Sequence, residues 1–294
     1  MSQRQPGTSV AIVGLGLIGG SLGLALRAAS YHVTGFARRP AVRRRALALN
    51  AVDVAASDLR ETADAEIIVL AVPVLATQAV FRQLAPQLSP GTIVTDVAST
   101  KVRILGWAAE LLPAGVHFVG GHPMAGRETA GIEHAEGTLF CGRTWCIVAP
   151  EEAPPAAVES VTALATATGA LPLAFDAATH DAAVAATSHV PFLAAKALAE
   201  AVLMQPDWPR IQPLASTGLR DTTRLASGNA LMHRDICVSN RTAILQQLDR
   251  FRERLDALAT LIREGDDEEL LAYFERLKTE RDRFVAYLDQ RRNT

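Results

Sequence analysis

The chain has few cysteines, few aromatic residues and almost no net charge. Three cysteines occur among 294 residues, and aromatic residues make up 5% of the chain. Cys141, Cys146 and Cys237 are odd in number and lack the spacing of metal ligands, so we expect neither a disulfide framework nor a bound metal. A formal net charge of −2 gives no global basic field. It argues against a nucleic acid or an anionic membrane as partner.

Long apolar runs are also scarce. The first nine residues are polar and lack the apolar core of a signal peptide. No stretch approaches the roughly 20 apolar residues that span a bilayer. Hydrophobic residues make up 49% and charged residues 20%, which is typical of globular proteins. We therefore expect a cytoplasmic protein with one large core or two moderate ones.

Short apolar segments alternate with stretches rich in alanine and leucine in the first part of the chain. The apolar segments are rich in valine and isoleucine, as strands covered on both faces should be. This alternation predicts βαβ units and a Rossmann-like, doubly wound, mainly parallel sheet in an α/β fold. The expected strands are 9–15, 31–37, 65–72, 92–98, 116–121, 144–149 and 171–177.

The pattern changes after residue 178, and no segment beyond it resembles a strand. Apolar residues from Leu248 to Ile262 recur at steps of three and four, which predicts a helix with one apolar face. Gly265 ends this helix, and Asp266 or Asp267 can cap the next one. We expect a dinucleotide-binding domain over 1–178 and an all-helical substrate domain over 179–294, through which two copies form a homodimer.

A glycine-rich loop follows the first expected strand. Gly14, Gly16 and Gly19 form the pattern G-x-G-x-x-G between that strand and a helical run. In this context the pattern indicates a dinucleotide site, with the pyrophosphate at the helix N-terminus. The cofactor-binding residues expected here are Gly14, Gly16, Leu17, Ile18 and Gly19.

The end of the second expected strand indicates which cofactor is bound. NAD-binding relatives of this fold carry an acidic residue there, which holds the ribose 2′-hydroxyl. This chain has Ala37 at that place, followed by Arg38 and Arg39. Guanidinium groups match the geometry and charge of a phosphate. The sequence therefore predicts NADP rather than NAD, with Arg38 and Arg39 near the 2′-phosphate, while the arginines at 43–45 extend along a helix surface.

Polar residues follow two neighbouring expected strands. Ser99 and Lys101 come after the strand at 92–98, and His122 comes after the strand at 116–121. Ligands of open α/β sheets bind at the carboxyl ends of the strands. A neutral histidine at that edge can take a proton from an alcohol as hydride leaves its carbon.

Five motifs in order resemble the prephenate/arogenate (cyclohexadienyl) dehydrogenase family. They are VGLGLIGGSLG, DVASTK, GGHPMAG, ATSHVPF and RDTTRLASGNALMHRD, and they extend from residue 13 to residue 235. The resemblance implies oxidative decarboxylation of a cyclohexadienyl substrate on the way to tyrosine. Hydride passes to the nicotinamide, carbon dioxide departs from the opposite ring carbon, and the ring becomes aromatic.

The resemblance also implies roles for particular residues. His122 accepts the hydroxyl proton, and Ser99 hydrogen-bonds both His122 and the substrate. His189 contacts the substrate, and Arg224 binds a substrate carboxylate through its guanidinium fork. His233 stands where relatives often carry an aromatic residue and is expected beside the substrate. Neither the local sequence nor the resemblance assigns a functional role to His117, His134 or His180.

Two other functions stay open at this point. One is another NADP-linked hydroxy-acid dehydrogenase or imine reductase, whose catalytic lysine would be Lys196. The other is a non-catalytic NADP sensor, which has no need of Ser99, His122 and Arg224. Prephenate and arogenate also stay open, with prephenate favoured because no acidic residue is evident for the ammonium group of arogenate.

Overall fold

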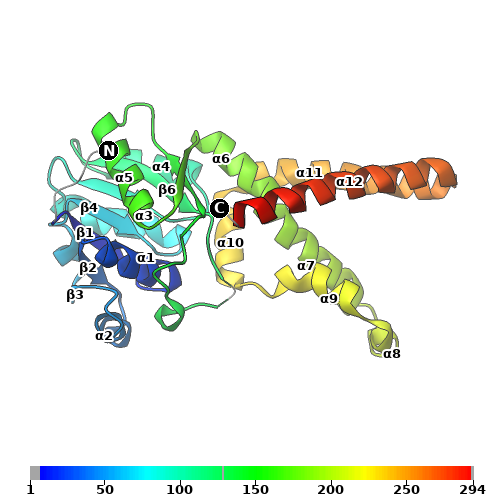
Figure 1. Cartoon of the computed structure of the whole chain (residues 1–294), viewed down its shortest axis with the longest axis horizontal. Helices are drawn as coiled ribbons and strands as arrows, with labels where there is room; N and C mark the ends of the chain where they lie inside the picture. Colours follow the sequence, from blue (N-terminus) through cyan, green and yellow to red (C-terminus); the bar gives the residue numbers. More distant parts are fainter. Residues whose placement is uncertain (1–6, 128, 293–294) are drawn as a thin grey trace. The chain divides into compact units, whose positions relative to one another are not determined.

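A computed structural model describes residues 7–127 and 129–292 of the chain. Compact packing divides it into two units, one ending at Arg241 and one beginning at Thr242. The first unit contains an eight-stranded sheet in the order β3-β2-β1-β4-β5-β6-β7-β8 (Figure 1). Neighbouring strands are parallel except β6 and β7, which run antiparallel. The first six positions have the strand order of a Rossmann dinucleotide-binding fold.

The strands are short. Their bounds are β1 Ser9–Val13, β2 His32–Phe36, β3 Val54–Ala56, β4 Ile67–Leu70, β5 Ile93–Asp96, β6 His117–Pro123, β7 Thr144–Val148 and β8 Leu171–Ala174. The helices of the sheet region are α1 Leu17–Ala28, α2 Pro40–Ala48, α3 Val74–Leu84, α4 Val102–Leu111 and α5 Pro155–Ala167. Short 3-10 turns lie at Leu59–Thr62, Ala85–Gln87 and Ile132–His134.

Two hydrophobic cores cover the two faces of the sheet. Side chains alternate across a strand, so Val10 and Ile12 of β1 enter one core while Ala11 and Val13 enter the other. Helices α1, α2 and α5 complete the first core, and α3 and α4 complete the second. This double covering explains why the strands are nearly continuous in apolar residues.

The expected fold class is confirmed, and all seven expected strands are present. The sequence did not indicate β3, which contains only the three residues Val54–Ala56. A strand of that length carries too few residues for an apolar pattern to stand out. In residues 179–292 the structure contains helices and turns but no strand, as expected.

The remaining helices of the first unit begin at α6. They are α6 Ala177–Val184, α7 Val190–Leu203, α8 Trp208–Ile211, α9 Thr217–Thr223 and α10 Ala230–Ser239. A π-helical turn over Ala185–His189 joins α6 to α7, and 3-10 turns lie at Gln212–Leu214 and Arg224–Ser227.

One expectation about apolar length was wrong. The continuous helical segment Ala177–Leu203 is long and apolar enough to span a membrane by length and composition alone. Its buried polar residues include His180, Asp181 and His189, and each is hydrogen-bonded to a residue outside this segment. Those bonds are what a core helix makes, and a single helix that passes the length test is weak support for a membrane span.

The second unit is a helical hairpin of α12, Asp267–Arg292, and of α11, Arg241–Glu264, apart from the first residue of α11. Gly265 has a φ of +69° and lies between them, as expected for the end of a helix. The Asp266 carboxylate accepts a hydrogen bond from the backbone N–H of Glu269 at 2.9 Å, which identifies Asp266 as the cap. Several large apolar side chains of the hairpin are exposed, among them Phe251, Ile262 and Phe274.

Candidate active site

The glycine-rich loop lies where the strand order reverses, between β1 and β4. Gly14 has a φ of +105°, and a Cβ there would stand 2.3 Å from the carbonyl oxygen of Ala71, just after β4. A Cβ on Gly19 would stand 1.8 Å from the carbonyl oxygen of Gly14. These two glycines are therefore required for the close packing of loop, helix and sheet.

Gly16 serves a different purpose from the other two glycines. A Cβ at Gly16 would meet nothing within 4 Å, so the backbone there borders open space. Helix α1 begins at the next residue, and no described side chain caps its first N–H groups. An exposed backbone at a helix N-terminus is the arrangement that a pyrophosphate occupies in this fold. Leu17 is buried and Ile18 packs against the first core, so both fix the start of the helix.

The turn after β2 carries the residues expected to choose between NADP and NAD. Ala37 is half-buried, while Arg38 and Arg39 are exposed. The guanidinium of Arg43 donates a hydrogen bond of 2.7 Å to the carbonyl oxygen of Ala37. It also donates one of 3.3 Å to the carbonyl oxygen of Arg38. Three guanidinium groups thus belong to this turn, and Arg43 holds its backbone in place.

His122 lies near the carboxyl end of β6 and is only 8% exposed. Its Nδ1 is 2.9 Å from the Nε2 of His180 on α6. Burial lowers the pKa of His122 well below 6.5, and His180, Lys101 and His189 lower it further. His122 is therefore a neutral imidazole at neutral pH, which a general base must be.

His180 continues a hydrogen-bonded chain away from His122. Its Nδ1 is 2.8 Å from an Oδ1 of Asp181, and both side chains are buried. The Asp181 carboxylate also accepts backbone N–H groups from Lys101 at 2.7 Å and from Val102 at 3.0 Å. The sequence analysis gave His180 no role, but the structure places it between His122 and Asp181. The sequence around His122 does not indicate the contact, because His122 and His180 are 58 residues apart.

A fully buried ion pair lies beside this chain. The Lys101 ammonium contacts the Asp96 carboxylate, and neither side chain is exposed. Asp96 also accepts the backbone N–H of Gly121 at 3.1 Å, one residue before His122. Burial lowers the pKa of Lys101, while Asp96 opposes that shift. The pair fixes the end of β6 relative to the loop after β5.

Ser99 lies in the loop between β5 and α4 and is half-buried. Its neighbours are anchored: the N–H of Ala98 donates to Asp96 at 3.0 Å, and the hydroxyl of Thr100 donates to Ser239 at 3.0 Å. Within the described part of the chain, the Ser99 side chain makes no hydrogen bond to His122. The expected bond is absent here, and Nδ1 of His122 is bonded to His180 instead.

His189 lies in the π-helical turn and is almost fully buried. Burial lowers its pKa to about 4, so it is neutral. The amide nitrogen of Asn240 is 2.8 Å from the carbonyl oxygen of Asp181 and 3.2 Å from Nδ1 of His189. Because the Asn240 amide donates, Nδ1 of His189 accepts, and Nε2 of His189 carries the proton. His189 therefore offers an N–H donor next to His180 and Asp181.

His233 stacks on Phe192 with ring centroids 3.9 Å apart and parallel planes. The Phe192 ring also contacts His189, at a centroid distance of 6.2 Å. Gly228 leaves the room that His233 fills, since a Cβ there would stand 2.5 Å from its ring. The structure thus brings His122, His189 and His233 into one neighbourhood through His180 and Phe192.

Arg224 begins the 3-10 turn Arg224–Ser227 and is exposed, with no described contact to His122. Lys196 of α7 donates a hydrogen bond of 2.9 Å to the carbonyl oxygen of Ala226, which ties this turn to α7. Lys196 is the catalytic lysine in the alternative hypothesis of a hydroxy-acid dehydrogenase or imine reductase. In this structure it holds the backbone of that turn.

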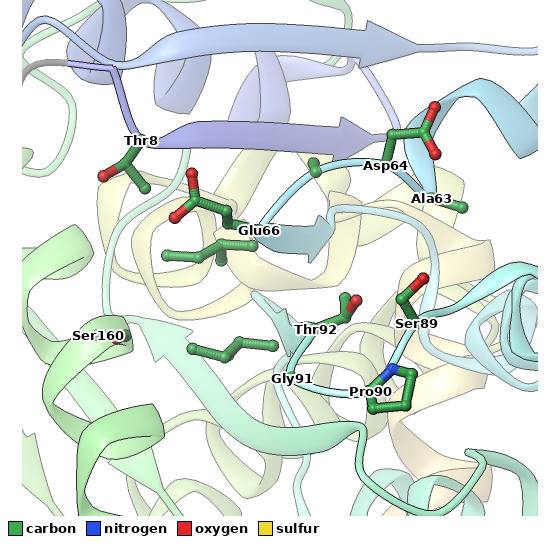
Figure 2. Close-up of a pocket in the computed structure, with 12 residues that line it drawn as sticks. Thr8, Ala63, Asp64, Glu66, Ser89, Pro90, Gly91, Thr92 and Ser160 are labelled. Atoms are coloured by element: carbon green, nitrogen blue, oxygen red, sulfur yellow. The ribbon is translucent and has the colours of Figure 1, made fainter.

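A hollow of about 450 Å3 lies at the opposite edge of the sheet. Figure 2 shows its wall built from Thr8 before β1, Glu66 before β4, Thr92 before β5 and Ser160 of α5. These positions are at the amino ends of the strands, whereas ligands of this fold bind at the carboxyl ends. The hollow is therefore separate from the residues that carry the expected chemistry.

A Rossmann sheet with a glycine loop at its switch point and a neutral histidine at the same edge defines a nicotinamide-dependent dehydrogenase. Residues 22–172 match the family model of the prephenate dehydrogenase nucleotide-binding domain, and residues 176–276 match that of the prephenate dehydrogenase dimerization domain. The chain belongs to the prephenate dehydrogenase family.

Individual relatives agree with this assignment. The chain is 31% identical to prephenate dehydrogenase of Bacillus subtilis over 279 residues, covering 93% of this chain and 75% of the relative. It is similar to the crystal structure of Synechocystis arogenate dehydrogenase, at 34% identity and a TM-score of 0.84, covering 94% and 99% of the two chains. Prephenate dehydrogenase from Aquifex aeolicus, solved with hydroxyphenyl propionate and NAD+, matches at 25% identity and a TM-score of 0.88, covering 97% and 100%.

Proposed function

We propose that this chain catalyses the NADP-linked oxidative decarboxylation of prephenate, and of arogenate to a lesser extent, in tyrosine biosynthesis. The observation that carries the proposal is the buried, neutral His122 at the carboxyl end of β6, at the sheet edge that the glycine loop shares. Membership of the prephenate dehydrogenase family supplies the reaction class.

The proposed reaction moves a hydride, a proton and carbon dioxide away from the substrate ring. A bound nicotinamide supplies the acceptor for the hydride that leaves the hydroxyl-bearing ring carbon. His122 takes the hydroxyl proton at Nε2, because its Nδ1 faces His180. As the hydroxyl becomes a carbonyl, the bond to the ring carboxylate breaks and carbon dioxide leaves. The ring then becomes aromatic, so the protein has mainly to position the substrate and hold the proton.

Four residues on the helical side, together with Ser99 of the loop after β5, complete the substrate site in this proposal. His189 donates through Nε2, since its Nδ1 faces the Asn240 amide. The Phe192–His233 stack gives the ring a flat apolar neighbour. Arg224 binds a substrate carboxylate, and Ser99 hydrogen-bonds the substrate hydroxyl. The substrate thus lies between a domain of residues 1–178 and a helical domain of residues 179–294.

The cofactor assignment rests on the turn after β2. Gly14, Gly16, Leu17, Ile18 and Gly19 form the dinucleotide cradle, and the open space at Gly16 is what a pyrophosphate needs. Arg38 and Arg39 bind the 2′-phosphate of NADP, while Ala37 places no carboxylate against it. An acidic residue, which NAD-binding members of this fold carry, is missing from that position.

We further propose a cytoplasmic homodimer. The exposed apolar side chains of α11 and α12 would be covered by a second copy, and the family model that matches 176–276 is described as a dimerization domain. Analytical ultracentrifugation of wild type and Phe274→Glu tests this, because a charge on the covered face should yield monomers.

Four initial-rate assays test the function: prephenate or arogenate, each with NADP or NAD, followed by nicotinamide absorbance. We expect the fastest turnover with prephenate and NADP, and carbon dioxide in equal amount to reduced cofactor. Binding of NADP without turnover of either substrate would contradict the proposed reaction and favour the sensor. Faster turnover with NAD would contradict the cofactor assignment alone.

A further inference from the structure

His180 is the only histidine in the described part of the chain whose two ring nitrogens both make a side-chain hydrogen bond. Its Nε2 is 2.9 Å from Nδ1 of His122, and its Nδ1 is 2.8 Å from Oδ1 of Asp181. All three side chains are buried. A neutral imidazole has one donor and one acceptor nitrogen, so the proton positions in such a chain depend on one another.

The carboxylate at the end of the chain fixes the direction. Asp181 accepts the backbone N–H of Lys101 and of Val102, at the start of helix α4. Two backbone donors at a helix N-terminus stabilise the ionised carboxylate, which can only accept hydrogen bonds. Nδ1 of His180 must therefore be the donor to Asp181, and Nε2 of His180 must be the acceptor.

The same reasoning determines the tautomer of His122. Because Nε2 of His180 accepts, Nδ1 of His122 donates and carries the proton of the neutral ring. Nε2 of His122 is then without a proton, which is the form that takes a proton from a substrate hydroxyl. Other ionisable groups near His122 are Lys101, which precedes α4 and is paired with Asp96, His189 in the π-helical turn, and Cys146, which stands opposite His122 in β7.

We propose that His180 and Asp181 are positioning residues that hold His122 in the tautomer with a bare Nε2. The inference rests on the proposed function, in which His122 is the base. In the reaction the substrate O–H bond breaks and its proton binds Nε2 of His122, while the proton on Nδ1 stays in its bond to His180. The resulting imidazolium is stabilised by an oriented imidazole backed by a carboxylate.

The hydrogen-bonded chain from His122 through His180 to Asp181 also joins the sheet to the helical region. His122 belongs to β6 and His180 to α6, while the donors that hold Asp181 belong to the N-terminus of α4. Any substitution that shifts α6 relative to the sheet would therefore change the proton position on His122. This coupling gives the helical region a role in catalysis beyond contact with the substrate.

The test compares two substitutions at one position. His180→Phe keeps the volume and removes the acceptor, and we expect kcat to fall on the order of 10²- to 10³-fold while KM for the cofactor is unchanged. His180→Gln restores an amide oxygen near the position of Nε2, and we expect it to recover at least about tenfold of that loss. His117→Gln is the matched control and should behave as wild type, because His117 lies at the amino end of β6, away from His122 near the carboxyl end of the same strand.

Nitrogen-15 NMR of histidine-labelled protein reads the tautomer without any turnover. For wild type we expect a protonated Nδ1 and a bare Nε2 at His122, assigned by its loss in His122→Asn. In His180→Phe, or in Asp181→Asn if the former does not fold, both tautomers should appear. A wild-type His122 protonated on Nε2, or a folded His180→Phe with kcat within about threefold of wild type, would overturn the inference. Absence of turnover with the expected tautomer present would instead count against the proposed function.

Discussion

The two ends of the proposed cofactor and substrate site are built in opposite ways. The turn after β2 is exposed and presents arginines whose partner would be the ligand. At the other end the charged and polar groups are buried: Asp96 ends β5, Lys101 lies in the loop after β5, and His180 and Asp181 belong to α6. Each of these side chains is hydrogen-bonded or ion-paired to another buried group. Exposed charges can be exchanged one at a time, whereas a buried partner cannot be removed without leaving the other unsatisfied.

The largest effect is expected at the buried end, from the base itself. His122→Asn removes the proton acceptor, and kcat should fall by about 10³- to 10⁴-fold, the upper part of the range for general bases. NADP affinity, measured by fluorescence titration, should stay within about twofold of wild type. A general base acts on the substrate proton and does not hold the dinucleotide.

Lys196→Met is the companion variant for this prediction. Lys196 ties α7 to the turn at Ala226, so we expect its loss to alter KM more than kcat. If Lys196→Met abolished turnover while His122→Asn retained it, the base would be Lys196 and the hydroxy-acid or imine enzyme would replace the present proposal.

The buried ion pair gives the next effect. Lys101→Met leaves the Asp96 carboxylate without its cation in a fully buried site, which should cost about 3–5 kcal/mol of unfolding free energy. The matched control is Arg60→Met, which breaks the exposed pair with Asp58 and should not change stability measurably. Urea unfolding of the three proteins measures both. Equal losses in the two variants would mean that burial does not distinguish these pairs.

Protonation of the buried histidines gives a smaller effect with a defined sign. The folded pKa of His189 is about 4 and the unfolded value is near 6.5, so the unfolded chain binds more protons between these values. The contribution of His189 to stability is therefore fully present above about pH 6.5 and is lost as the pH drops toward 4. His189 alone accounts for about 3 kcal/mol of that loss, at 1.36 kcal/mol for each pKa unit.

His122 adds to the same acid destabilisation, because its pKa is also lowered by burial. Urea unfolding of wild type and His189→Gln between pH 4 and pH 7.5 separates the two contributions. The variant should show a shallower dependence with part of the slope remaining. An identical slope in both proteins would show that His189 is not the neutral buried group inferred from the structure.

The sequence predicted the fold and the position of the arginine turn after β2, because both follow from local patterns. The glycine spacing, the apolar strands and the arginines after Ala37 are each visible within a few residues. Gly16 even shows the open space that the motif requires. Strand β3 was missed because three residues, Val54–Ala56, carry no pattern.

The buried end could be predicted only in part, because its contacts join distant segments. The motifs indicated His122 and His189, but not that His180 would lie between His122 and Asp181. Nor did they show that Asn240 would bond both Asp181 and His189. The one local signal was the adjacent pair His180-Asp181 in an otherwise apolar helix, where a buried charge needs a partner.

The smallest effect is expected at the exposed turn, where solvent competes with the ligand. Arg38→Ala should lower the ratio of kcat/KM for NADP over NAD by about tenfold, the effect of one charge-assisted hydrogen bond to phosphate. Ala37→Asp should lower the same ratio further, since its carboxylate repels the 2′-phosphate and accepts the ribose hydroxyl of NAD.

Arg45→Ala is the control for this turn, because Arg45 is exposed on α2 with the same charge but lies beyond the turn that Arg43 holds. It tests whether the preference comes from a placed guanidinium or only from the positive charge of the region. An equal loss in Arg38→Ala and Arg45→Ala would favour the general field, and it should then diminish strongly with added salt. A loss confined to Arg38→Ala, and insensitive to salt, would assign the phosphate contact to that side chain.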